Sequence, residues 1–301
     1  MSTTDTQPRD RTLGAVTILA GARGGRYPHG NSLLVAGAEE TLLVDPSLSL
    51  IERDSLPLTD RVLNSHCHED HVAGNHLYPK VPWLLHEADL PGMRSLDDMM
   101  AIYGMSPRIA AAFREILVEE FHYVARPDAT PFRDGDVFDL GGARVRAIHA
   151  PGHTRGHCVL HVEPEGVLYL GDIDLSSFGP YYGDAWSSLE DFERTLAAVR
   201  RIDARWYATF HHVGVVDGRA AFLERLDRFA AVIGTRERRL LEFLAEPRTI
   251  DEIVAHRFVY RPGDAVPFAD DVERRSMTQH LERLVAGGRV GEVEAGRFRA
   301  R

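Results

Sequence analysis

The apolar positions of this chain fall into short runs of strand length, separated by longer segments in which they recur with helical spacing. Runs typical of strands cover 16–19, 31–35, 41–44, 61–64, 81–85, 137–140, 144–149, 158–162, 167–170 and 206–210. Helical spacing covers most of 87–121, and then 189–201 and 219–233. The runs within 137–149 predict a hairpin that turns at Gly141-Gly142. Strands that alternate with helices predict an α/β fold for this part of the chain.

Polar side chains gather where several of these strands end. The densest group is the sequence H-C-H-E-D-H at 66–71, between the strand at 61–64 and a helix expected from about Val72. Three imidazoles and two carboxylates in six positions are hard to explain by packing, and zinc and iron accept both ligand types. The alternative is a solvated polar loop. The pattern therefore predicts a metal site on a strand-to-helix loop.

Three later loops that follow strands carry further candidate ligands. They are His153 and His157 after 144–149, Asp172 after 167–170, and the pair His211-His212 after 206–210. Loops on one edge of a sheet can meet at one point, so the four loops together predict one site. Asp45, which ends the strand at 41–44, is either a carboxylate beside this site or a turn residue before Pro46. His157 is either a partner of the metal ligands or a hydrogen-bonded structural histidine.

The ordered set H-x-H-x-D-H, P-G-H-T, G-D and a late histidine resembles the metallo-β-lactamase superfamily of hydrolases, and residues 12–235 follow that order. The resemblance implies an α/β fold, a four-layer αβ/βα sandwich of two mixed sheets with the site at one edge. The ligands it implies are His66, His68 and His153 for a first metal ion, and Asp70, His71 and a late histidine for a second, with Asp172 bridging the two.

The late histidine is one of two neighbours. The family pattern has a histidine a short loop before a valine, and counting back from Val215 favours His212 over His211. Two metal ions about 3.5–4 Å apart can share a hydroxide and polarise the bond that it attacks. Asp70 and Asp172 are the expected catalytic residues, because their charge tempers the two dications and Asp70 can orient the nucleophile.

Composition narrows the possible functions. The chain has 301 residues, of which 44% are hydrophobic and 27% are charged, as in an ordinary soluble globular protein. The formal net charge of -10 argues against a general affinity for nucleic acid phosphates. Residues 1–11 are polar and predict a disordered leader without a signal peptide, which favours a cytoplasmic location. The two cysteines, Cys67 and Cys158, predict no disulfide framework, and each is either a small buried residue or a thiol near the metal.

Two segments are candidates for the walls of a substrate pocket. The helical region 87–121 contains four methionines, and residues 176–183 form an aromatic loop rich in turn residues. Methionine suits adaptable apolar pockets, and an aromatic loop after Asp172 suits a pocket wall. Ordinary core packing and surface turn packing are the respective alternatives.

From about Thr235 the pattern changes to three helices, the last at 271–286, and a hairpin at 290–298. This order predicts a winged-helix-like domain over 236–301. It resembles a subgroup of the superfamily that includes ribonuclease-like and glyoxalase II-like members. The segment has thirteen arginines against twelve acidic residues, so its charge is close to neutral. We therefore expect it to form a homodimer contact or to complete the pocket, rather than to bind nucleic acid.

The main hypothesis is a dinuclear metal-dependent hydrolase that cleaves a small ester, thioester or lactone with a metal-bridging hydroxide. The expected cofactors are two divalent ions, Zn2+ first, with Fe or Mn as alternatives. The second hypothesis, motivated by the C-terminal segment, is a phosphodiesterase or endoribonuclease that acts on single-stranded RNA. The third is an iron-dependent oxygenase. The all-histidine first site argues against its diiron form, and His71 with a late histidine argues against a mononuclear form.

Overall fold

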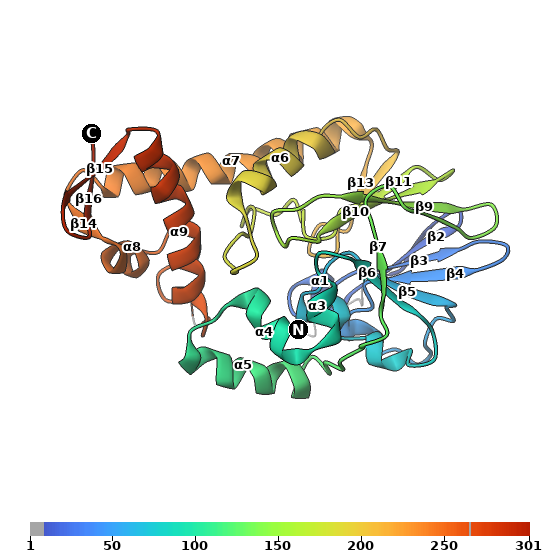
Figure 1. Ribbon diagram of the computed structural model, residues 1–301. Coiled ribbons are helices and arrows are strands. Elements are labelled where there is room, and N and C mark those ends of the chain that lie inside the picture. The colour runs from blue at the N-terminus through green and yellow to red at the C-terminus, as the bar shows by residue number, and fades with distance from the viewer. Residues whose placement is uncertain (1–8, 265) are drawn as a thin grey trace, which may run out of the picture.

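Two β-sheets lie face to face in the structure, a computed structural model that describes residues 9–264 and 266–301 (Figure 1). The first sheet has the order β1 (Arg11–Leu13), β2 (Val16–Leu19), β3 (Ser32–Ala36), β4 (Thr41–Val44), β5 (Arg61–Asn64), β6 (Trp83–His86) and β7 (Thr130–Phe132). The second has the order β13 (Val215–Asp217), β12 (Trp206–Ala208), β11 (Val167–Tyr169), β10 (Cys158–Glu163), β9 (Arg144–His149) and β8 (Val137–Asp139).

Both sheets are mixed. Strands β1 to β4 pair antiparallel, whereas β4 to β7 pair parallel. In the second sheet only β11 and β12 pair parallel. Strands β4 and β5, and likewise β11 and β12, therefore end at a shared sheet edge, which brings the loops that follow them together.

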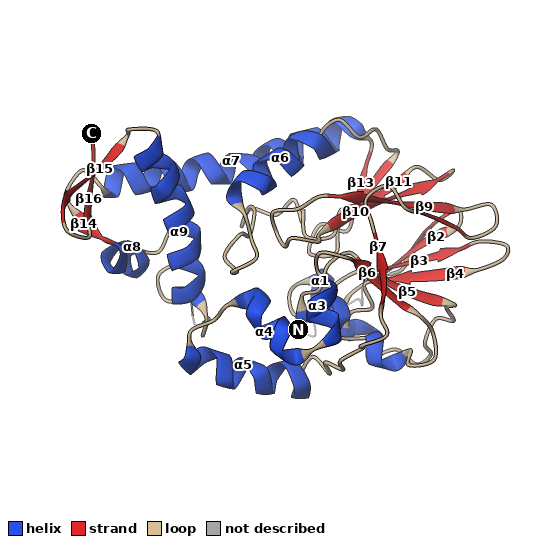
Figure 2. Cartoon of the chain, viewed as in Figure 1, coloured by secondary structure: helices blue, strands red, loops and turns tan. Residues whose placement is uncertain are grey.

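Two groups of helices flank the two sheets on their outer sides (Figure 2). Helices α6 (Leu189–Val199) and α7 (Arg219–Phe243) cover the second sheet, and α3 (Leu90–Arg94), α4 (Leu96–Tyr103) and α5 (Pro107–Glu119) lie on the side of the first. The remaining α-helices of the described residues are α1 (Ala22–Gly25), α2 (Glu69–Val72), α8 (Ile250–His256) and α9 (Ala269–Ala286), and two short 3-10 helices cover Leu48–Leu50 and Asn75–Leu77.

Alternating side chains on the strands separate three apolar layers. On β4, Leu42 and Val44 pack between the two sheets, whereas Leu43 packs towards the helices of the first sheet. On β10, Leu160 joins the core between the sheets, and Val159 packs with α6 and α7. Strands buried on both faces need apolar residues at successive positions, as these runs have. The predicted α/β fold with four αβ/βα layers is confirmed.

The chain departs from the predicted boundaries at two places. The predicted leader 1–11 lies outside the described residues except for its last three. Of those, Arg11 already pairs with Ile18 in β1, and Asp10 forms an ion pair with Arg53 at 2.6 Å. Helix α7 runs without a break through residue 235, where the pattern predicted a division between 12–235 and 236–301. Its amphipathic spacing simply continues past that point.

The C-terminal segment has its own small core and sheet. The end of α7, α8 and α9 enclose a cluster that includes Leu240, Ile253 and Met277. A three-stranded sheet of β14 (Arg248–Thr249), β16 (Arg297–Ala300) and β15 (Val290–Glu294) completes it. No helix within the described ranges combines the length and hydrophobicity that a bilayer crossing demands.

Candidate metal centre

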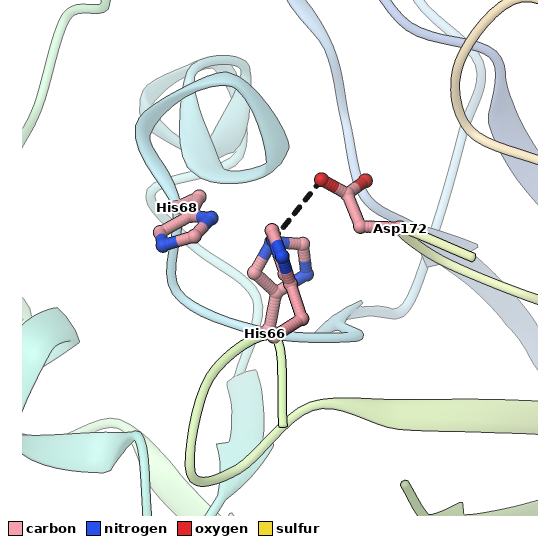
Figure 3. A group of neighbouring side chains, drawn as sticks. His66, His68 and Asp172 are labelled. Atoms are coloured by element: carbon pink, nitrogen blue, oxygen red, sulfur yellow. Dashed lines mark hydrogen bonds and ion pairs between the residues drawn. The ribbon is translucent and has the colours of Figure 1, made fainter. Parts of the chain in front are cut away.

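The candidate ligands lie in the four predicted loops, at one edge of the paired sheets. The loop after β5 leads into α2, whose first turn contains Glu69 and Asp70, where acidic side chains suit the helix dipole. The other loops follow β9, β11 and β12. Figure 3 shows that His66, His68 and Asp172, which come from two of these loops, point towards a common space.

The first cluster consists of His66, His68, His153 and Asp172. One ligand atom from each lies within 4.8 Å of all the others, and the three imidazoles are buried. Asp172 Oδ2 is 3.1 Å from His153 Nε2 and 4.0 Å from His66 Nε2. Three imidazoles and a carboxylate at this spacing are a suitable donor set for zinc or iron.

The second cluster consists of Asp70, His71 and His211, all buried and within the same mutual distance. His211 Nε2 is 2.9 Å from Asp70 Oδ2. His71 Nε2 is 2.8 Å from Asp172 Oδ1, the oxygen of that carboxylate which does not face the first cluster. Asp172 therefore reaches both clusters, one oxygen to each.

His211, and not the preferred His212, takes part in this cluster. His211 is only 7% exposed, and its Nδ1 lies 3.0 Å from the carbonyl of Gly25, which leaves Nε2 for the cluster. His212 is exposed, has a φ of 54 and lines the cavity, but it belongs to neither cluster. This geometry replaces His212 by His211 in the ligand set that we propose below.

Asp45 lies on the far side of His71 from the second cluster and orients its ring. Its buried carboxylate accepts hydrogen bonds from Ser65 N at 2.7 Å, Ser65 Oγ at 2.6 Å and Tyr169 OH at 2.9 Å. His71 Nδ1 donates to it at 2.9 Å, so Nε2 of that ring carries the lone pair that faces the cluster. Of the two alternatives for Asp45, the structure thus favours the carboxylate beside the site.

His157 and Asp184 also orient ligands without joining either cluster. His157 donates from Nδ1 to the carbonyl of Ala150 at 3.0 Å and accepts the backbone N–H of Asp172 at Nε2, 3.1 Å away. Burial lowers the pKa of His157 to about 3, so the ring is neutral and can accept. Asp184 Oδ2 lies 3.0 Å from His68 Nε2, which leaves Nδ1 as the free nitrogen of that ring.

The buried polar atoms of the two clusters fit a pair of cations. His66 Nε2 and His153 Nε2 face each other at 3.2 Å, and the buried Asp70 Oδ2 lies 2.9 Å from His211 Nε2 without the geometry of a hydrogen bond. Such atoms cost free energy when nothing satisfies them, and a shared cation would do so. Burial would raise the pKa of Asp172, but the facing imidazoles, His71 first, hold that pKa well below its usual range. The carboxylate is therefore ionised, as a metal ligand must be.

The profile of the metallo-beta-lactamase superfamily matches residues 26–227, a range that contains every residue of both clusters. The chain belongs to the metallo-beta-lactamase superfamily. Its buried histidine and aspartate clusters support a dinuclear site for divalent metal ions.

Two curated relatives and one solved structure of this superfamily show the range of similarity. The chain is 27% identical over 172 residues to an acyl-coenzyme A thioesterase, MBLAC2, of Bos taurus, in a match that covers 49% of this chain and 60% of that protein. It is 28% identical over 208 residues to a hydroxyacylglutathione hydrolase of Methylococcus capsulatus, in a match that covers 65% of this chain and 70% of that protein. The metallo-beta-lactamase family protein TTHA1429 of Thermus thermophilus is 26% identical, with a TM-score of 0.70 over 96% of this chain and 99% of that one.

A cavity of about 730 Å³ opens beside the two clusters. Metal-site residues at its base include His68, Asp70 and Asp172. Its apolar lining comes from α5, from the aromatic loop and from the C-terminal segment, and includes Ile109, Phe113, Ile116, Phe178, Tyr181, Tyr260, Val266 and Phe268. Of the four methionines in 87–121, Met93, Met99 and Met100 pack in the core, and Met105 lines the cavity. Both cysteines are buried and free.

Glu69 forms a buried contact that the motif did not identify. Its carboxylate accepts hydrogen bonds from Tyr27 OH at 2.8 Å and from Tyr103 OH, and all three residues line the cavity. Glu69 lies inside H-C-H-E-D-H, but the two tyrosines come from a glycine-rich loop and from α4, far apart in the sequence. No local pattern links these three positions.

Proposed function

We propose that this chain hydrolyses an acyl ester, thioester or lactone at a dinuclear metal site. The proposed ligands are His66, His68 and His153 for one ion, and Asp70, His71 and His211 for the other, with Asp172 between them. The single observation that carries this proposal is that the Asp172 carboxylate has one oxygen facing each cluster at the base of an apolar pocket.

The residues of the chain have separate roles in the proposed reaction. Two divalent ions held here would supply an activated water and Lewis acidity for the carbonyl oxygen. The His157 hydrogen bond to the backbone N–H of Asp172 holds this residue in place, with one carboxylate oxygen towards each cluster. Asp70, whose Oδ2 lies 2.9 Å from His211 Nε2, is the carboxylate that can orient the attacking water. The apolar walls exclude bulk water from the acyl group.

The nature of the pocket favours an acyl substrate over a phosphodiester. None of the described residues that line it is a lysine or an arginine, the side chains that recognise phosphate. The names of the two relatives, a thioesterase and a hydrolase of an acylated thiol compound, agree with that preference. The single-stranded RNA alternative has no comparable support from the pocket.

The test is a panel of acyl thioesters, oxoesters and lactones, assayed with metal-loaded wild-type protein and with His76→Ala as a control. His76 lies one turn beyond α2, half-buried, and belongs to neither cluster. We expect turnover of at least one class by both proteins, and loss of that turnover with Asp172→Asn. If protein that holds two metal ions cleaves no member of the panel, the proposal is wrong.

A further inference from the structure

One wall of the cavity is supplied by the C-terminal segment. Four lining residues, Tyr260, Val266, Pro267 and Phe268, precede or begin α9, about ninety residues after Asp172 in the sequence. The facing wall is the apolar side of α5, with Ile109, Phe113 and Ile116 among its lining residues. We name residues 258–268 the wall segment, of which 265 lies outside the described residues.

A row of aromatic rings connects the metal end of the cavity to the wall segment. The ring of His68 stacks on Tyr103 with centroids 5.4 Å apart, and Tyr103 meets Phe113 edge to face at 5.0 Å. Phe113 in turn meets Phe268 of the wall segment at 5.8 Å. Such contacts hold rings in place, so a continuous apolar surface leads from a metal ligand to the wall segment.

The charged side chains of the lining are almost all at the metal end. They are Glu69, Asp70, Asp172, Asp174 and Asp184, with Glu120 the one further acid among the described lining residues. The apolar part offers an anionic substrate tail no lysine or arginine among the described lining residues, so burying that charge there would be unfavourable. The occupant of the apolar part must therefore be uncharged and apolar along its length.

The first residues of the wall segment, 258–260, are held in place by α9. Glu273 of α9 is fully buried and accepts the backbone N–H groups of Phe258, Val259 and Tyr260 at 2.8 to 2.9 Å. Helix α9 is itself attached to the catalytic part, because Asp271 accepts Ser106 N at 2.9 Å, and Gln279 accepts Leu189 N at 2.7 Å. These contacts connect residues 258–260 to α9 and connect α9 to the catalytic part.

We propose that the wall segment ends an acyl-chain pocket and thereby determines the longest linear acyl group that the enzyme accepts. The inference rests on the proposed acyl hydrolase function and names its substrate class as esters or thioesters with an extended apolar acyl chain. The acyl chain of the substrate occupies the pocket, and the leaving group lies outside it.

The kinetic test uses a saturated series from acetyl to palmitoyl, as oxoesters and as thioesters. Each buried methylene contributes ~0.8 kcal/mol, so kcat/KM should rise by up to about fourfold per methylene until the chain meets the wall segment. We expect Val266→Trp to move that limit to shorter chains and Phe268→Ala to move it to longer ones. Matched controls are Val293→Trp, at an exposed position of β15, and Phe298→Ala, in the C-terminal core.

A binding measurement separates this inference from the function on which it rests. Linear alcohols from butanol to dodecanol are titrated calorimetrically into the metal-loaded protein, and no hydrolysis is needed. We expect the affinity to rise with alcohol length up to a limit, and we expect that limit to be shorter in Val266→Trp but unchanged in Val293→Trp. This result supports the pocket even if no ester is cleaved. Hydrolysis with no dependence on acyl length, or the same length limit in Val266→Trp and wild type, overturns the inference and leaves the hydrolase proposal intact.

Discussion

At the metal end of the pocket, charged side chains from four short loops meet in a buried space, and several of them have a hydrogen-bond partner behind them. At the apolar end, rings and aliphatic side chains of α5 and of the described residues near the start of α9 line the cavity, and Phe113 meets Phe268 edge to face. The metal end depends on groups placed within a few residues of a strand end. The apolar end depends on the docking of elements as distant as Ser106 and Asp271.

The two ends of the pocket therefore suit different tasks. The loops at the metal end suit the proposed reaction, and the apolar end suits the selection of a substrate. Strand ends fix the positions of ligands to within tenths of an ångström, which a metal centre requires. Substrate selection needs only a surface of the right shape, and a segment added at the C-terminal end of the chain can provide it. Changes at the two ends should therefore have effects of different kinds and sizes.

The largest effect is expected at the residue that both clusters share. Asp172→Asn removes the charge that faces both sites, so we expect both metal ions to be held less tightly. Activity should fall by more than about 100-fold, the upper range for residues that only support a ligand. Elemental analysis and kcat/KM measured on the same preparation test this. Full metal content in the variant would show that Asp172 does not bridge the two clusters.

A smaller effect is expected behind the ligands, at Asp45. Asp45→Asn keeps the size of the side chain but weakens the hydrogen bond that orients His71. We expect a loss of about 10- to 100-fold in metal affinity or activity. The control is Tyr169→Phe, which removes one donor to Asp45 and leaves the His71 contact in place. Equal losses in the two variants would contradict a specific role for the contact between Asp45 and His71.

The smallest effect is expected at the junction of α7 and α9, away from the metal. Glu237 contacts His280 and Arg283 of α9, and these contacts lower its pKa from 4.5 to about 2, with the His280 hydrogen bond as the largest cause. A carboxyl with a lowered pKa in the folded state stabilises the fold above its unfolded pKa, and this contribution is lost as pH falls from about 4.5 to about 2.

Because Glu237 is partly exposed, solvent screening reduces that contribution to about 1 kcal/mol. Glu237→Gln should therefore lower the free energy of unfolding by this amount at pH 7, and the difference from wild type should vanish near pH 2. Urea unfolding at a series of pH values measures it. A difference that stays constant as the pH is lowered would contradict the assigned cause.

The sequence predicted the fold and most of the candidate site because both depend on local signals. Apolar runs on both faces of β4 and β10 indicated buried strands, and the ligands lie directly after strand ends. The choice between His211 and His212 depended on how the chain turns at 209–214, which counting residues does not capture. The turn is set by Thr209, whose hydroxyl donates to the carbonyl of His211 at 2.6 Å.

The features that sequence reasoning missed are contacts between distant segments. The carboxylate of Glu69 meets two tyrosines from separate parts of the chain, and Asp184 meets His68 across the site. The predicted helix 219–233 was too short, because α7 continues to Phe243, and the division at residue 235 stays a prediction. The predicted homodimer contact of the C-terminal segment stays a prediction.

The central claim is that two divalent ions are held by a ligand set that includes His211. Elemental analysis of wild-type protein, His211→Ala and His212→Ala, each as purified, tests it most directly. We expect about two ions per chain in wild type and in His212→Ala, and a loss of one in His211→Ala. A single iron per chain in wild type, or a loss of metal only in His212→Ala, would contradict the account.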